Sequence, residues 1–135
     1  MEGKGRITGH TGLLALIGSP VGHSGSPAMY NYSFEKLGLD YAYVAFDIKV
    51  EEVKAALDAM RLFHMRGCNV TMPCKTEAAK YMDELSPAAR IIGAVNTIVN
   101  EDGKLIGHMT DGEGFVGNLR DHGIEIKGKK ITVAG

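Results

Sequence analysis

The stretch Asn69-Val-Thr-Met-Pro-Cys-Lys75 decides how this chain folds around it. Proline lacks a donor N–H and disfavours helix in the residue before it, so an extended segment over 68–71 has to turn at Pro73. That turn presents the Thr71 hydroxyl and the Lys75 amine just beyond the end of a strand. Ligands of open α/β sheets bind outside the carboxyl ends of the strands. Lys75 is therefore a candidate acid–base group, and a solvated surface lysine is the alternative.

Length and composition are those of a soluble globular domain. The chain has 135 residues, enough for one domain with its own core, and 44% of them are hydrophobic. Its 15 basic and 16 acidic side chains leave a net charge of -1, which argues against nucleic acid or an anionic membrane as partner. No apolar run reaches transmembrane length, and residues 1–10 lack the apolar segment of a secretion signal. These features indicate a cytoplasmic protein.

The two cysteines, Cys68 and Cys74, flank the central motif. Their spacing matches no zinc motif and the five histidines are scattered, so no metal site is predicted. In a cytosolic chain they are expected to be reduced thiols, with a disulfide between them as the less favoured alternative.

Hydrophobic periodicity predicts strands and helices in alternation before the motif. Ser26 followed by Pro27 is typical of an N-cap and the first helical position, so we expect a helix to begin there and to end at Gly38. Ser24 stays free beside the start of that helix, which favours anions. A ligand carboxylate would fit that corner, although both serines could equally serve only to cap and turn. We further expect strands over 13–18 and 41–48, and an amphipathic helix over 51–63.

The second half of the chain continues the alternation. A helix is expected from Lys75 to about residue 85, and a short one from Ser86-Pro87. Strands over 93–100 and 104–109 are expected to form a β-hairpin with its turn at 100–103. The helix that follows is expected to have Asp111 as its N-cap, and a last strand is expected over 131–134.

Asn96 is a polar residue inside the first hairpin strand, among apolar neighbours. Its carboxamide either satisfies backbone groups or points at a ligand hydroxyl. Asp111 follows the second hairpin strand, as Thr71 and Lys75 follow theirs. The predicted fold is an open, mostly parallel twisted α/β sheet flanked by helices, with one antiparallel hairpin. Residue spacing alone supports a small-molecule site built from three strand ends.

Four motifs resemble the shikimate dehydrogenase family: GSPVGHSGSP over 18–27, NVTMPCK over 69–75, GAVNT over 93–97 and TDGEGF over 110–115. They occur in the family's order over nearly the whole chain. The resemblance implies reduction of 3-dehydroshikimate to shikimate with NADPH, in aromatic amino-acid biosynthesis. It also implies an N-terminal substrate domain and a C-terminal Rossmann domain for the nucleotide.

The resemblance also assigns roles to individual residues. By position, Ser24 and Ser26 would bind the substrate carboxylate, and Lys75 with Asp111 would form the catalytic pair. Hydride transfer to a ketone leaves an alkoxide that needs a proton, which a lysine beside a carboxylate can supply. The ring hydroxyls would be bound by four residues: Thr71, Lys75, Asn96 and Asp111.

Some positions lean toward the quinate/shikimate branch of the family, which accepts quinate and often uses NAD. Met109 stands where the family usually has asparagine, and Tyr43 matches a tyrosine that lines the site in that branch. Met72 points the same way, whereas Asn69 and Thr71 resemble the strict shikimate enzymes. The sequence therefore leaves two alternatives open: quinate as an additional substrate, and NAD as the cofactor.

On the family pattern, residues 1–111 correspond to the substrate-binding domain. Residues 112–135 correspond to a connecting helix and the first strand of a dinucleotide-binding domain, with Gly135 as the first glycine of its turn. We therefore expect a dehydrogenase fragment that binds no cofactor by itself, and a non-catalytic shikimate-binding module is the alternative. The implied partner is a small-molecule substrate, and a homodimer is allowed.

Overall fold

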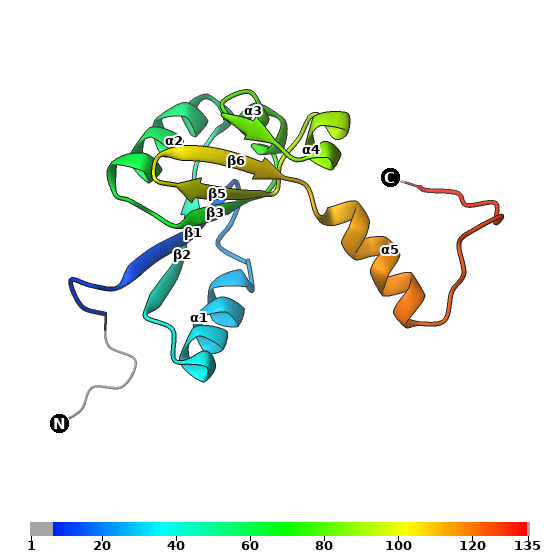
Figure 1. The fold of residues 1–135 in the computed structure, drawn as a ribbon, viewed down its shortest axis with the longest axis horizontal. Coiled ribbons are helices and arrows are strands. Elements are labelled where there is room, and N and C mark those ends of the chain that lie inside the picture. The colour runs from blue at the N-terminus through cyan, green and yellow to red at the C-terminus, as the bar shows by residue number, and fades with distance from the viewer. Residues whose placement is uncertain (1–6, 135) are drawn as a thin grey trace.

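A six-stranded sheet in the order β2-β1-β3-β5-β6-β4 forms the centre of the computed structural model, which describes residues 7–134 (Figure 1). Strand β5 pairs antiparallel with both of its neighbours, and the other pairings are parallel. The predicted open, mostly parallel sheet with one antiparallel hairpin is confirmed. The strands are β1 Gly12–Gly18, β2 Tyr41–Asp47, β3 Gly67–Val70, β4 Glu84–Leu85, β5 Thr97–Glu101 and β6 Lys104–His108.

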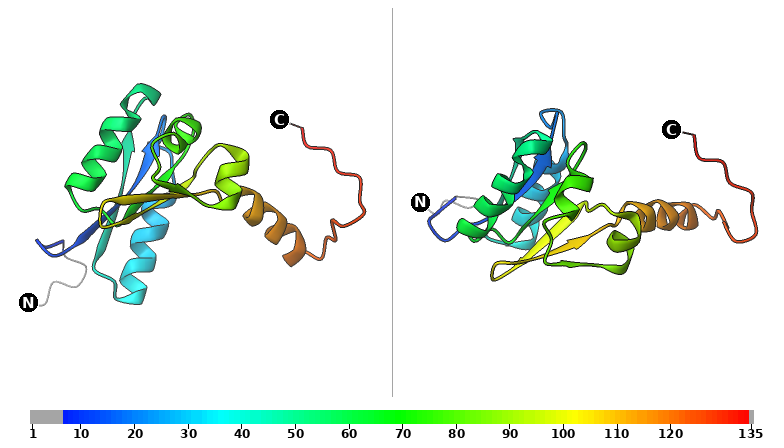
Figure 2. Two further views of the ribbon diagram at one scale, coloured as in Figure 1. Left: turned by 45° about the horizontal axis from the view of Figure 1, so that its top comes forward. Right: turned by 90° about the horizontal axis from the view of Figure 1, so that it is seen from above.

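Helices cover both sides of the sheet, as two views show (Figure 2). Helix α2 buries Val53, Leu57 and Met60, one turn apart, in the larger core. Helix α1 covers β1 and β2 from the other side, where Phe34 joins a smaller core. The helices are α1 Ser26–Leu37, α2 Val53–Leu62, α3 Lys75–Ala79, α4 Pro87–Ile92 and α5 Asp111–Asp121, with a 3-10 turn at Val50–Glu52.

Helix α5 leaves the sheet after β6 and projects away from the other elements (Figure 1). None of its residues is buried, and Phe115 is 59% exposed. Residues 122–134 after it have no helix or strand. Residues 131–134 do not form the expected strand in this structure, because a strand needs a neighbour to satisfy its backbone groups and no described strand pairs with this segment. Gly135 lies outside the described residues.

The helix expected from Lys75 to about residue 85 is more than twice as long as the observed helix, which has 5 residues. Helix α3 ends at Ala79, and Glu84–Leu85 form the edge strand β4 beside β6. Backbone bonds from Asp83 N–H to the Leu105 carbonyl (2.9 Å) and from Ser86 N–H to the Gly107 carbonyl (2.9 Å) fix this pairing. Pairing with a distant strand thus overrides local helical preference.

The hairpin is confirmed, with two differences in its limits. Strand β5 begins at Thr97 rather than 93, because Gly93 ends α4 in the left-handed region (φ 73°). The turn comprises two residues, Asp102 and Gly103, both with positive φ. A two-residue turn of that kind matches the twist of the strands that it joins.

Two helices begin one residue earlier than expected. Gly25 rather than Ser26 is the N-cap of α1, and Thr110 rather than Asp111 is the N-cap of α5. Neither N-cap uses a side-chain hydrogen bond. Ser26 and Asp111 are consequently the first helical residues, and their side chains are available for other contacts.

Gly67 allows β3 and β5 to approach closely, and its replacement tests this packing. A Cβ at this position would collide with the Ile98 carbonyl oxygen in the neighbouring strand. We expect Gly67→Ala to lower the free energy of unfolding by about 1–3 kcal/mol, as overpacking does. Urea denaturation measures the change. Gly22→Ala is the control, since an added Cβ there meets no atom within 4 Å. Equal stability of the two variants would contradict the packing argument.

Candidate functional site

The reversed direction of β5 brings three predicted site segments to one edge of the sheet. β3 and β6 end at this edge, and β5 begins there. Thr71 and Lys75 follow β3, Asn96 precedes β5, and Asp111 follows β6. The four residues predicted from their places beside strand ends therefore lie at one edge of the sheet.

Lys75 and Asp111 form an ion pair at this edge, each from the first position of a helix. Lys75 Nζ donates to Asp111 Oδ2 at 2.5 Å. The side chains are 23% and 55% exposed, so the pair is open to solvent on one side. The hydrogen bond from Lys75, assisted by one from Asn96, holds the pKa of Asp111 below its ordinary value against the effect of partial burial. Asp111 is therefore an ionised partner for the lysine at neutral pH.

Asn96 has the first of the two roles that its sequence position allowed, and its side chain also contacts Asp111. Its Oδ1 accepts from the backbone N–H of Thr110 at 3.1 Å, which satisfies a backbone group. Its Nδ2 donates to Asp111 Oδ1 at 2.8 Å and to Thr110 Oγ1 at 2.9 Å. Asn96 thereby fixes the carboxylate that holds Lys75.

A second hydrogen-bonded group extends from Tyr43 across the sheet. Tyr43 is 3% exposed, and its hydroxyl donates to Asn69 Oδ1 at 2.9 Å. Asn69 Nδ2 donates in turn to Thr97 Oγ1 at 3.2 Å and to the Asn96 carbonyl at 3.4 Å. Burial raises the pKa of Tyr43, so the phenol stays neutral and remains a donor.

Sequence reasoning did not assign Asn69 or Thr97 to the site. The available signal was the alternation in β3, where Asn69 is the polar residue between buried Cys68 and Val70. That alternation places Asn69 on the opposite face of the sheet from the larger core. It does not say which side chain of another strand lies beside it.

The two serines lie where the chain enters α1. Ser24 Oγ accepts from the Ser26 N–H at 3.2 Å, so Ser24 has the turn-forming role that the sequence left open. The Ser26 hydroxyl lies beside the Tyr43 hydroxyl and counters part of the rise in its pKa. The serine corner, meaning Ser24 and Ser26, thus joins the strand-end groups through Tyr43 and Asn69.

Thr71 contacts β1 through both its backbone and its side chain. Its N–H donates to the Ile17 carbonyl at 2.9 Å, and its methyl group fills the space where Gly18 has no side chain. Any Cβ at position 18 would collide with that methyl group. Glycine at position 18 therefore leaves the space that the Thr71 side chain occupies. These two residues belong to the first and second of the four motifs.

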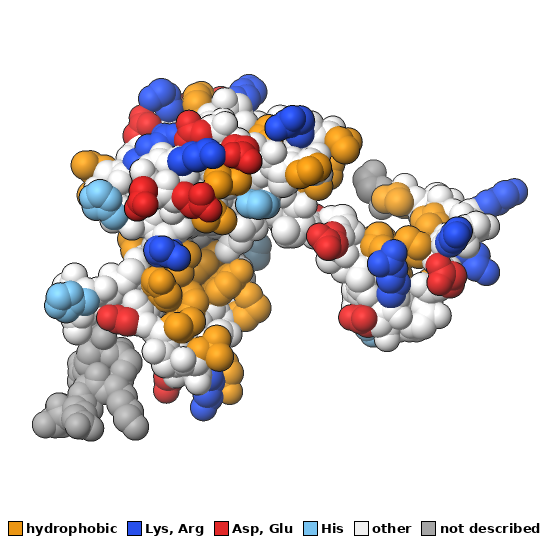
Figure 3. All heavy atoms as spheres, viewed as in Figure 1, with side chains coloured by type: hydrophobic (Ala, Val, Ile, Leu, Met, Phe, Trp, Pro, Cys, Tyr) orange, Lys and Arg blue, Asp and Glu red, His pale blue; other side chains and the backbone are white. Residues whose placement is uncertain are grey.

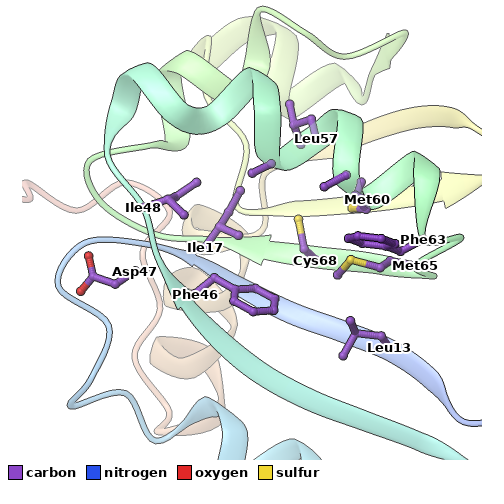
Figure 4. Close-up of a pocket in the computed structure, with 12 residues that line it drawn as sticks. Leu13, Ile17, Phe46, Asp47, Ile48, Leu57, Met60, Phe63, Met65 and Cys68 are labelled. Atoms are coloured by element: carbon purple, nitrogen blue, oxygen red, sulfur yellow. The ribbon is translucent and has the colours of Figure 1, made fainter.

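A separate apolar cavity of about 350 Å³ lies between α2 and strands β1 to β3 (Figure 4). Leu13, Phe46, Phe63 and Cys68 are among its lining side chains, and none of the predicted site residues is. Cys68 and Cys74 are free buried thiols, so the disulfide alternative is wrong. Burial raises the pKa of the Cys68 thiol to about 12, which keeps it protonated.

The surface in Figure 3 shows lysines and arginines interspersed with acidic side chains over the part of the molecule around α2 and β6. Ion pairs account for several of these charges, such as Lys54 with Asp58 at 2.7 Å and Lys104 with Glu84 at 2.7 Å. Within residues 7–134, no helix is long and apolar enough to cross a membrane.

The fold is an open, mostly parallel α/β sheet with a polar edge at which the ends of three strands meet. Residues 16–98 match the family model described as the shikimate dehydrogenase substrate binding domain. The match covers more than half of the sequence. The chain belongs to the shikimate dehydrogenase family.

Individual relatives agree with this assignment. The chain is 53% identical over 130 residues to the shikimate dehydrogenase (NADP(+)) of Listeria monocytogenes, and 52% identical over 132 residues to that of Streptococcus uberis. Each comparison covers 96% of this chain and 45% of the relative, so the chain spans slightly under half the length of these curated relatives.

Solved structures give the same result. The L. monocytogenes shikimate 5-dehydrogenase, in complex with shikimate and NAD, superimposes with a TM-score of 0.87 at 53% identity, over 92% of this chain and 43% of that one. The Thermus thermophilus enzyme in complex with shikimate gives a TM-score of 0.82 at 41% identity, over 88% of this chain and 46% of that one.

Proposed function

We propose that this chain is the substrate-binding part of a dehydrogenase that interconverts 3-dehydroshikimate and shikimate. The observation that carries the proposal is the Lys75–Asp111 ion pair at the edge where β3 and β6 end. The proposed cofactor is NADP(H), as in the names of the relatives, with NAD(H) as the alternative. The nucleotide would be held by the part of the relatives that this chain does not span, and it supplies the hydride when bound.

The residues of this chain would handle the proton and the orientation of the substrate. As hydride reaches the carbonyl carbon, the two electrons of the carbonyl π bond move to oxygen, and Lys75 Nζ donates a proton there. In the oxidation of shikimate the neutral amine accepts the hydroxyl proton. Asp111 holds the lysine, and Asn96 holds Asp111.

Two regions would position the substrate. Ser24 and Ser26 would bind its carboxylate at the start of the 12-residue helix α1, where the helix dipole favours an anion. Thr71 and Asn96 would bind ring hydroxyls with the catalytic pair. The buried Tyr43 would lie behind these groups and orient Asn69.

A quinate/shikimate dehydrogenase is the second candidate. Met109 is 8% exposed and belongs to the larger core, so this position gives the site no polar group where the family usually has asparagine. A non-catalytic shikimate-binding module is a third reading, and the lysine–carboxylate pair favours an enzyme over it.

The proposal also includes a cellular compartment and an oligomeric state. Two free thiols are typical of a reducing compartment, which favours the cytoplasm. A homodimer is included because β2 is an edge strand on which Val44 and Phe46 are exposed.

Titration of the 135-residue chain with shikimate tests the proposal. We expect saturable binding, and Thr71→Val should weaken it about tenfold, because it removes one hydroxyl that bonds to the ring. Isothermal calorimetry measures both dissociation constants. Thr132→Val makes the same chemical change at an exposed position in the irregular C-terminal segment and should have no effect.

Two results would count against the proposal: no saturable binding of shikimate by the parent, or equal weakening by the two threonine changes. The same titration with quinate compares the first two candidates. Tighter binding of quinate than of shikimate would favour the second.

A further inference from the structure

Asn31, in the second turn of α1, makes an unusual junction between a helix and an edge strand. Its Nδ2 donates to the Tyr43 carbonyl at 2.8 Å, and its Oδ1 accepts from the Tyr43 N–H at 2.9 Å. A neighbouring strand would normally make these two bonds, and no strand within residues 7–134 lies on this side of β2. The carboxamide therefore takes the place of a strand at one residue.

The residue before Asn31 holds the side chain of the same tyrosine. The Tyr30 ring stacks on the Tyr43 ring with a centroid distance of 4.5 Å and an interplanar angle of 12°. Tyr30 thus fixes the ring of Tyr43 while Asn31 fixes its backbone. The position of Tyr43 relative to α1 is set by two consecutive helical residues.

Tyr43 in turn connects two parts of the proposed site. Its hydroxyl lies beside Ser26 and donates to Asn69, which bonds to the Asn96 carbonyl. Asn96 bonds to Asp111. Tyr43 is therefore linked to the Lys75–Asp111 pair by hydrogen bonds through Asn69 and Asn96, and it lies beside Ser26 at the start of α1.

We propose that Asn31 is a positioning residue that sets the separation of the serine corner from the Lys75–Asp111 pair. The inference rests on the proposed function, in which the carboxylate of the substrate binds at the first place and its reacting oxygen at the second. Asn31 lies five positions after Ser26, about 7.5 Å along the helix at 1.5 Å per residue, so it acts through Tyr43 rather than on the ligand.

Loss of the Asn31 carboxamide should alter alignment more than folding. Asn31 is exposed, so water can replace both of its bonds to the Tyr43 backbone. The helix then keeps its apolar contacts through Phe34 and loses the polar contact that fixes its register against β2. The binding of a carboxylate is affected in the ground state and the transition state alike.

The kinetic test uses Asn31→Leu, which has similar volume, in the complete dehydrogenase. We expect KM for shikimate to rise about tenfold while kcat stays within about threefold of the parent, because uniform binding is what is lost. Asn31→Asp keeps an acceptor for the Tyr43 N–H and should show a smaller rise. Ser33→Ala is the control on the same helix, since its hydroxyl bonds only to the Met29 carbonyl one turn earlier.

A second measurement needs no enzymatic activity. In NMR spectra of the 135-residue chain, the side-chain amide signals of Asn69 should shift in Asn31→Leu and not in Ser33→Ala. Unchanged Asn69 signals would overturn the inference even if shikimate proved not to be the substrate. A KM within about twofold of an active parent, or a kcat that falls as far as KM rises, would overturn it as well. An inactive parent would instead remove the proposed function, and the Asn69 signals would then decide the inference alone.

Discussion

Replacing Lys75 by alanine in the complete dehydrogenase is expected to lower kcat by roughly a hundred- to ten-thousand-fold, the usual contribution of a general acid–base group. The lysine is the cation at the site edge that is held by Asp111, and its Nζ is the proposed proton donor to the substrate oxygen. KM should change less, because only one hydrogen bond to the ring is lost in binding, about 1 kcal/mol. Steady-state kinetics with shikimate separates the two constants.

A second lysine in the same segment provides the control for this change. Lys80 pairs with Glu77 at 2.7 Å, and its side chain is 64% exposed. Lys80→Ala removes the same charge and should leave kcat unchanged. Thr71→Val offers a further contrast, since a neutral hydroxyl positions the substrate without moving a proton and its loss should appear mainly in KM. If Lys75→Ala retained kcat within about threefold of the parent, Lys75 would be only a binding residue.

Asp111→Asn is expected to lower kcat by about a hundredfold, at the lower end of the acid–base range. The new side chain has the same shape and can still contact Asn96, but it no longer carries the charge that holds Lys75. Its effect should therefore resemble that of the lysine change more than that of the threonine change. Asp121→Asn, at the other end of α5, is the control for a lost carboxylate on this helix.

The difference in stability between Asp111→Asn and the parent should depend on pH. The hydrogen bond from Lys75 lowers the pKa of folded Asp111 below its ordinary 3.8. The stabilising contribution is therefore present above that value and is lost as the pH falls through the lower folded pKa. The denaturation midpoints of parent and variant should differ at pH 6 and converge as the pH falls progressively below 3.8. A difference that grew on acidification would contradict the assigned direction.

Local chemistry was sufficient to predict the end of β3 but not the contacts between distant strands. Proline at 73 and the change of pattern after Val70 place Thr71 and Lys75 beyond β3, and the structure agrees. The bond between Tyr43 and Asn69 depends on register instead. Leu14 lies opposite Tyr43 in β2, whereas Leu16 lies opposite Asn69 in β3, so the two residues are offset by two positions across β1.

The short strand β4 shows the same limit. Residues 80–85 have a composition compatible with helix, and the decisive contacts come from β6, more than 20 residues later. Asp83 accepts from the Leu105 N–H and from Arg61, which no local pattern indicates. Roles at the site came from family resemblance, since physical chemistry gave a place for a ligand and no name for it.

Helix α5 has a mechanical consequence because Asp111 is its first residue and none of its residues is buried. The helix has 11 residues and is about 16 Å long at 1.5 Å per residue. The proposed catalytic carboxylate, Asp111, lies at the end that is joined to the sheet. If the helix tilted by about 10° at Asp111, its far end would move by roughly 3 Å. Asp111 itself would move by only a small fraction of that distance. A change in the tilt of α5 would therefore move the residues after Asp121 relative to the sheet edge far more than it would move Asp111.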